Sequence, residues 1–82
     1  MNEAALAQRL VAALVDAAAR ESGGKAKLLS VEINTLAPGG EGEPIVQVTR
    51  KTRSLLFLHA ELMAADGTRA ATAASVHQIA EG

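Results

Sequence analysis

The spacing of apolar residues changes once along this chain, and the change limits the folds that the chain can adopt. Residues 3–21 contain neither Gly nor Pro and consist mostly of Ala, Leu and Val. At the helical period of about 3.6 residues, one face of this segment carries Leu6, Leu10, Ala13, Leu14 and Ala17. Residues 22–24, Ser-Gly-Gly, then form a helix stop. The pattern predicts one helix over about residues 3–21, with Asn2 as its N-cap.

Beyond the helix stop the period falls to two, which is typical of strands with one buried face. In the first such segment, apolar Leu29, Val31 and Ile33 alternate with polar Ser30, Glu32 and Asn34. The predicted strands cover about residues 28–36, 45–51, 55–64 and 69–79. The segment 37–44 contains both prolines and three of the seven glycines, and it predicts a loop. We therefore predict a single α+β domain over residues 1–82, with one long N-terminal helix packed on a curved four-stranded antiparallel sheet.

The dipeptide Asp66-Gly67 is the strongest short-range hairpin signal in the chain. If these are the two turn residues, the last two strands pair Leu62 with Ala71, Ala60 with Ala73, Leu58 with Ser75 and Leu56 with His77. Large side chains on one strand then face smaller ones on the next. Such a face leaves room for the leucine ridge of the helix. The opposite face of the third strand carries a mixed set, Phe57, His59, Glu61 and Met63.

Composition excludes several functional classes. The chain has no Cys and two His, so neither a disulfide framework nor a structural metal site is expected. A net charge of -1 and one aromatic residue leave neither a basic field nor a stacking surface for nucleic acid. Charged Glu3, Arg9 and Asp16 in the predicted helix argue against a signal peptide or a membrane span. We expect a cytoplasmic protein with no membrane partner, and its 82 residues give a small core that favours oligomers.

Four segments together resemble a known family. They are Leu14-Val15-Asp16-Ala17-Ala18 in mid-helix, residues 29–34, residues 50–57 and Ala65-Asp66-Gly67-Thr68. Their order and spacing, over residues 10–79, are similar to those of the acyl-CoA thioesterases of the hotdog fold, particularly the phenylacetate-degradation type. The chain looks like a truncated small member of that family.

The resemblance implies a hotdog-like fold, a homodimer or homotetramer joined edge to edge, and an acyl thioester bound at the subunit interface. It assigns the role of general base or nucleophile to the mid-helix carboxylate, which is Asp16 here. It places the nucleotide end of coenzyme A near the basic turn, which we define as Arg50, Lys51 and Arg53. No cofactor is implied, because coenzyme A enters only as part of the substrate.

Two departures from the family pattern bear on activity. The family helix begins with a His-Gly-Gly turn whose backbone N–H stabilises the developing oxyanion, whereas residues 7–9 here are Ala-Gln-Arg. An N–H inside a helix is already bonded to a carbonyl four residues back. The first strand of the family is also missing, which should leave the edge of strand 45–51 to be covered by a partner or a loop. The chain is therefore either a thioester hydrolase or a non-catalytic dimeric module that binds an acyl group or a partner protein.

Each candidate residue also has a structural interpretation. Asp16 stands four residues before Arg20, a favourable spacing for an ion pair on the helix surface. The basic turn is equally consistent with solvated cations. His59 and Glu61 share one strand face and can act as a base with its orienting group, or lie on a half-exposed sheet face. His77 has no neighbouring nucleophile in the sequence and is interpreted as structural.

Overall fold

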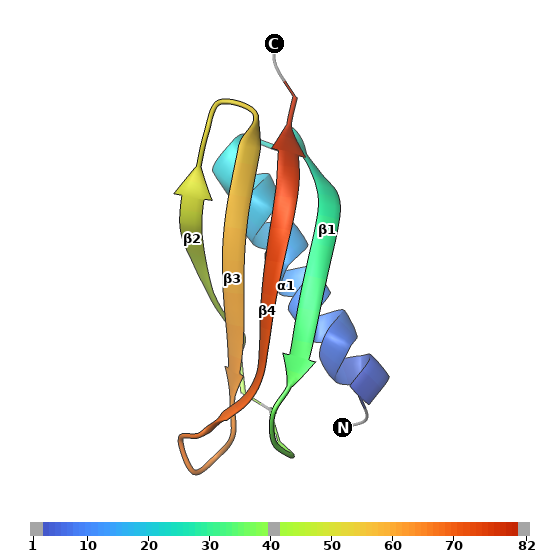
Figure 1. Ribbon diagram of the computed structural model, residues 1–82, viewed down its shortest axis with the longest axis vertical. Coiled ribbons are helices and arrows are strands. Elements are labelled where there is room, and N and C mark those ends of the chain that lie inside the picture. Colours follow the sequence, from blue (N-terminus) through green and yellow to red (C-terminus); the bar gives the residue numbers. More distant parts are fainter. Residues whose placement is uncertain (1–2, 40–41, 81–82) are drawn as a thin grey trace.

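One helix lies across one face of a four-stranded antiparallel sheet (Figure 1). The computed structural model describes residues 3–39 and 42–80. Its elements are α1 (Glu3–Ser22), β1 (Ala26–Thr35), β2 (Ile45–Lys51), β3 (Leu55–Met63) and β4 (Arg69–Ile79), and the strands lie in the order β1-β4-β3-β2. This architecture confirms the predicted α+β fold, and the strand bounds differ from the predicted ones by two residues at most. Asn2, the predicted N-cap, lies outside the described residues.

The helix stops where the sequence predicts. Gly23 and Gly24 both have positive φ angles, of 65° and 83°, which side chains other than Gly rarely adopt. The Gly24 N–H donates to the Ala19 carbonyl at 2.8 Å, and the Ser22 hydroxyl donates to the Ala18 carbonyl at 2.7 Å. These bonds satisfy carbonyls that the end of a helix would otherwise leave unpaired. Within the described residues, no helix is long and apolar enough to cross a membrane.

The core lies between α1 and the face of the sheet that α1 covers. The helix contributes Leu6, Leu10, Leu14, Ala17 and Ala18, and the sheet contributes Leu56, Leu58, Ala60, Leu62, Ala71 and Ala73. Leu62 pairs with Ala71, Ala60 with Ala73, Leu58 with Ser75 and Leu56 with His77, as predicted. Ala13, expected on the buried face, is only half-buried, and Ala18 is buried instead.

The turn between β3 and β4 differs from the predicted two-residue turn. The Ala64 N–H donates to the Thr68 carbonyl at 2.7 Å, so residues 65–67 form a three-residue turn, with Gly67 at a φ of 89°. A β-bulge between Leu62 and Met63 accommodates the extra turn residue. The predicted pairing therefore holds from Leu62 back to Leu56. The Thr68 hydroxyl and N–H both donate to the Asp66 carboxylate, and these bonds lower the pKa of Asp66.

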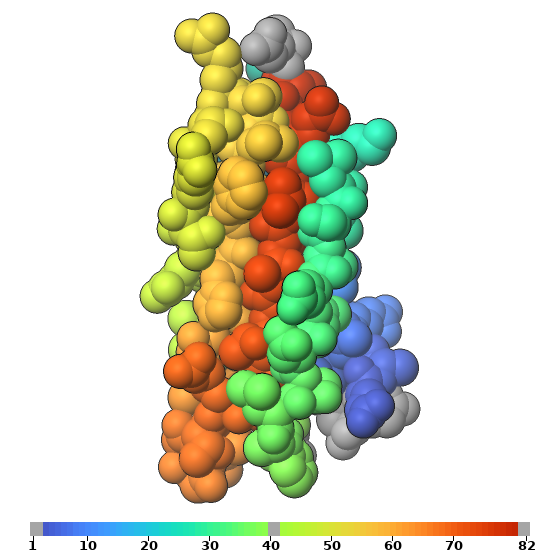
Figure 2. All heavy atoms as spheres, viewed as in Figure 1, coloured from blue at the N-terminus to red at the C-terminus, as the bar shows by residue number. Residues whose placement is uncertain are grey.

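Two surfaces of the sheet have no cover among the described elements. One is the face opposite α1, where Figure 2 shows the side chains of all four strands and α1 is visible only beside β1. The other consists of the two sheet edges, formed by β1 and β2. The expectation that strand 45–51 forms an edge is confirmed. Large apolar side chains are exposed on both edge strands, at Leu29 and Val31 of β1 and at Ile45 and Val48 of β2.

Truncation of the helix ridge tests this packing. Leu10 is 0% exposed, and we expect Leu10→Ala to lower the free energy of unfolding by about 3 kcal/mol because it leaves a cavity against the sheet. Leu36→Ala is the matched control, since Leu36 is 58% exposed, and it should change stability by less than about 0.5 kcal/mol. Urea unfolding measures both. Equal losses in the two variants would contradict the assigned core.

Candidate functional site

Asp16 lies on an exposed flank of α1. Seven residues separate it from Arg9, which is two helical turns, so both project from the same side of the helix. The Arg9 guanidinium donates to the carbonyl of Gly42, three residues before β2 begins. This flank of α1 therefore faces the β2 side of the sheet. In the described part of the chain, Asp16 makes no hydrogen bond, and the ion pair with Arg20 that its spacing favours is not formed.

The backbone of residues 7–9 offers no free donor. These residues lie in the interior of α1, which begins at Glu3. Their N–H groups are bonded to carbonyls four residues back, as the sequence predicts. The site of the family's oxyanion donor is thus occupied by regular helix in this chain.

Two open surface cavities lie beside the loop that joins β1 to β2. One, of about 400 Å³, is lined by the first turns of α1 and the end of β1, including Glu3, Leu6 and Thr35. The other, of about 670 Å³, is lined by the same loop and by the β3–β4 turn. Asp16 lines neither cavity.

The basic turn is divided between the two faces of the sheet. A β-bulge between Val48 and Arg50 shifts the strand register. Arg50 lies on the uncovered face, where its guanidinium carbon is 6.0 Å from the centre of the Phe57 ring. Lys51 lies on the α1 face, and its Nζ donates to the Glu21 carbonyl at 3.1 Å, at the negative end of the helix. Arg53 is exposed in the turn itself.

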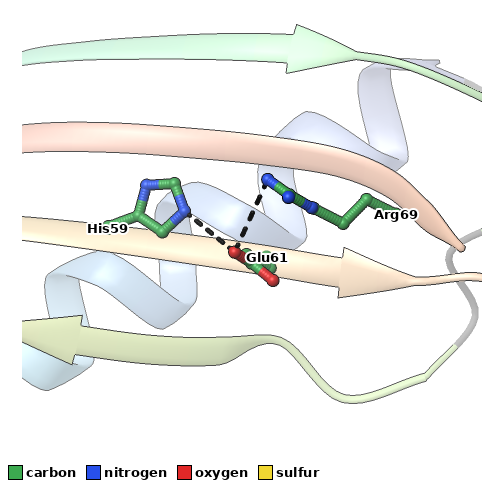
Figure 3. Close-up of polar contacts among 3 residues, drawn as sticks. All are labelled: His59, Glu61 and Arg69. Atoms are coloured by element: carbon green, nitrogen blue, oxygen red, sulfur yellow. Dashed lines mark hydrogen bonds and ion pairs between the residues drawn. The ribbon is translucent and has the colours of Figure 1, made fainter. Parts of the chain in front are cut away.

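A second polar cluster lies on the uncovered face of the sheet (Figure 3). His59 Nε2 is 3.3 Å from Glu61 Oε1, and Arg69 Nη1 is 3.9 Å from the same oxygen. The two β3 side chains are about one-third exposed. This places the His59 and Glu61 pair together, as the sequence suggests. No nucleophilic side chain joins the three in the bonds found among the described residues, so the cluster is an ion-pair network on the surface.

His77 and Ser75 form a buried polar pair on β4. Their exposed fractions are 1% and 3%, and His77 Nε2 is 2.8 Å from Ser75 Oγ. Burial lowers the pKa of the His77 imidazole. The sequence analysis missed this partnership, although two residues separated by one in a strand share a face. Because both side chains are enclosed, the pair cannot meet a substrate.

The described residues contain no group of three or more His, Cys, Asp or Glu side chains that could hold a metal ion. The candidate site consists of Asp16, the α1 cations Arg9 and Arg20, and the basic turn.

No protein-family profile matches the sequence, and no curated protein sequence does. Solved structures do share the fold. An X-ray structure from the thioesterase superfamily has a TM-score of 0.77 and 20% identity, and it covers 98% of this chain and 62% of its own. A Bacillus halodurans protein crystallised with CoA has a TM-score of 0.79 and 12% identity, covering 98% and 59%. A Thermus thermophilus thioesterase, complexed with coenzyme A and Zn, has a TM-score of 0.74 and 23% identity, covering 100% and 67%.

The chain thus has the hotdog fold of thioesterase-superfamily proteins, which confirms the resemblance at the level of fold. It spans 59 to 67% of the length of these three proteins.

The exposure of the Glu61 network allows a direct test. We expect Glu61→Gln to lower the free energy of unfolding by less than about 1 kcal/mol, because partly exposed ion pairs are screened by water. Urea unfolding at neutral pH measures the difference, and Thr72→Val at the paired position of β4 controls for a polar loss on the same face. A loss above about 2 kcal/mol would mean that the network is buried in the folded protein in solution.

Proposed function

We propose that this chain is the core of a thioesterase-like protein that binds an acyl-CoA thioester and hydrolyses it with Asp16 as general base or nucleophile. The observation that carries the proposal is the place of Asp16. It is an exposed carboxylate about two-thirds of the way along α1, with no hydrogen bond or ion pair found among the described residues, in a fold shared with proteins crystallised with CoA. Perturbed or unpaired carboxylates in a ligand-binding fold are candidates for acid and base chemistry.

The reaction would proceed in balanced steps. As a base, Asp16 takes a proton from water while the oxygen of that water bonds to the thioester carbonyl carbon. The carbonyl oxygen becomes an oxyanion, and its collapse breaks the carbon–sulfur bond. The leaving thiolate receives the proton, giving a carboxylic acid and the free thiol of coenzyme A. The developing oxyanion needs a hydrogen-bond donor, and residues 7–9 of the same α1 do not supply one.

We propose that a second copy completes the site by pairing along β2. The Asp16 flank of α1 faces the β2 side, and β2 is a free edge. Val48 pairs with buried Leu58 and thus points to the α1 face, yet it is 43% exposed. Antiparallel pairing of two β2 strands would satisfy the edge N–H and C=O groups and cover Val48. It would also bring partner atoms to the flank where a substrate must bind.

In this arrangement the basic turn contributes to binding of the coenzyme A phosphates. Arg53 is free to reach a phosphate, and Arg50 adds positive charge from the uncovered face. Lys51 keeps its bond to the Glu21 carbonyl with one of its three donors and adds charge from the α1 face.

One observation favours a second candidate function. The N–H groups of residues 7–9 are bonded within α1 and cannot stabilise an oxyanion. If no other group supplies that hydrogen bond, the chain would be a dimeric module that binds an acyl group or a partner protein and does not hydrolyse a thioester.

Removal of the carboxylate separates the two functions. We expect Asp16→Asn to abolish thiol release from acyl-CoA without changing the melting temperature, because Asp16 is exposed and forms no hydrogen bond or ion pair with the described residues. Glu21→Gln, which removes a negative charge from another exposed position of α1, should retain the wild-type rate. A panel of short, medium, long and aryl acyl-CoA substrates is the assay. Wild-type rates in Asp16→Asn would refute the catalytic role, and a silent wild type that binds acyl-CoA would establish the binding module.

The molar mass of the protein in solution tests the proposed β2 interface. We expect the wild type to be a dimer at micromolar concentration and Val48→Lys to be a monomer, because two buried ammonium groups would face each other across the edge. Leu29→Lys, on the β1 edge, should remain dimeric. Light scattering coupled to size exclusion measures all three. A monomeric wild type, or dissociation by Leu29→Lys alone, would overturn this interface.

A further inference from the structure

The last two turns of α1, residues 15–22, are held to the sheet differently from the turns before them. Residues 3–14 bury Leu6, Leu10 and Leu14, whereas residues 15–22 bury only Ala17 and Ala18. The polar pair of Ser75 and His77 lies on the face of β4 that α1 covers, beside Leu56 of β3. Lys51, which pairs with Leu56, reaches the Glu21 carbonyl. Lys51, Leu56 and His77 thus form a row across β2, β3 and β4. Because Lys51 reaches the end of α1, this row places His77 beneath the last turns of the helix.

The surroundings of His77 favour the neutral imidazole. Its cross-strand neighbours are Leu28 and Leu56, and its polar side-chain partner among the described residues is Ser75. Ile79 follows on the same face. A protonated imidazole here would keep one hydrogen bond and lose most of its hydration, which is costly in an apolar environment.

Among the described residues, the charged side chains around this row place no buried negative charge beside His77. On β2 the nearest is the Lys51 ammonium, a like charge. On α1, Asp16, Arg20 and Glu21 are all exposed, and Lys25 is exposed ahead of β1. On β1, β3 and β4 no ionised side chain occupies the positions paired with His77.

We propose that Ser75 and His77 form an acid-sensitive lock between the sheet and the last two turns of α1. At neutral pH the uncharged pair fills the space left by Ala17 and Ala18. When His77 binds a proton, the imidazolium must leave this space for water, and the last turns of α1 separate from β4. The lock regulates the proposed site, because these turns carry Asp16 and the carbonyl that binds Lys51. The regulation of catalysis rests on the proposed function, but the lock itself does not.

The direction in which pH changes the stability follows from the lowered pKa of His77. Burial lowers the pKa of His77 in the folded chain below its unfolded value of 6.5. The stability that the neutral imidazole contributes is therefore complete above pH 6.5 and is lost as the pH falls from there toward the folded pKa. The folding equilibrium constant should fall about tenfold for each pH unit over which only the unfolded chain binds this proton.

The chain offers a matched control, because its only other histidine is His59. We expect urea unfolding of the wild type and of His59→Gln to show the same loss of stability between pH 7.5 and 5.5. The double variant Ser75→Ala/His77→Leu, which replaces the pair by apolar groups of similar size, should lose stability over this range much less. An equal loss in the double variant would overturn the lock, because the titrating group would then be another residue.

A measurement on the wild type avoids any folding failure of the double variant. In NMR spectra, the His77 ring signals should stay at their neutral positions until the amide signals of the last turns of α1 broaden or shift. A His77 ring that titrates while those amide signals stay unchanged would overturn the proposal. Both readouts need no thioester hydrolysis, so a failed lock and a failed catalytic assignment are told apart.

Discussion

The packing of leucine against alanine determines the rest of this structure. Leucines of α1 meet a sheet face on which β3 carries Leu and β4 carries Ala and Ser. The small β4 side chains let the helix approach the centre of the sheet, and the large β3 side chains fill the space beside it. With one aromatic residue in the chain, this complementarity supplies most of the buried apolar surface. The position of α1, and hence of every residue on its exposed flank, follows from it.

The same packing motivates the proposal of a second copy. One helix covers one face of four strands, so both edges and the opposite face remain open. A domain of 82 residues buries a smaller share of its surface than a larger one does, and association is the usual remedy when no disulfide or metal is present. The flank with Arg9 and Asp16 lies toward β2. Stability and site formation therefore favour the same edge.

Sequence periodicity predicted the elements well because each has a distinct apolar spacing. The register of β3 and β4 was also predictable, since Leu62 through Leu56 must face α1. The β-bulges were not predictable. Too few residues follow a bulge at a strand end for the change in apolar alternation to be recognised. The bulge before Arg50 decides which face each residue takes: it pairs Arg50 with Phe57 on the uncovered face and Lys51 with Leu56 on the α1 face. The role of Asp16 was not predictable from local sequence either, because an exposed helical carboxylate is written the same way whether it meets solvent or a ligand.

The contrast between the last two turns of α1, residues 15–22, and the turns before them links stability to the site. A buried Leu contributes about 1.5 to 3 kcal/mol through apolar burial, and a buried Ala much less. The turns that carry Asp16 bury only Ala17 and Ala18, so they are held by less apolar area than the turns that precede them. The Ser75 and His77 hydrogen bond and the Lys51 bond to the helix end act where that area is smallest. Polar contacts depend on protonation, whereas leucine contacts do not, so the part of the helix nearest the proposed chemistry is also the part whose attachment responds to pH.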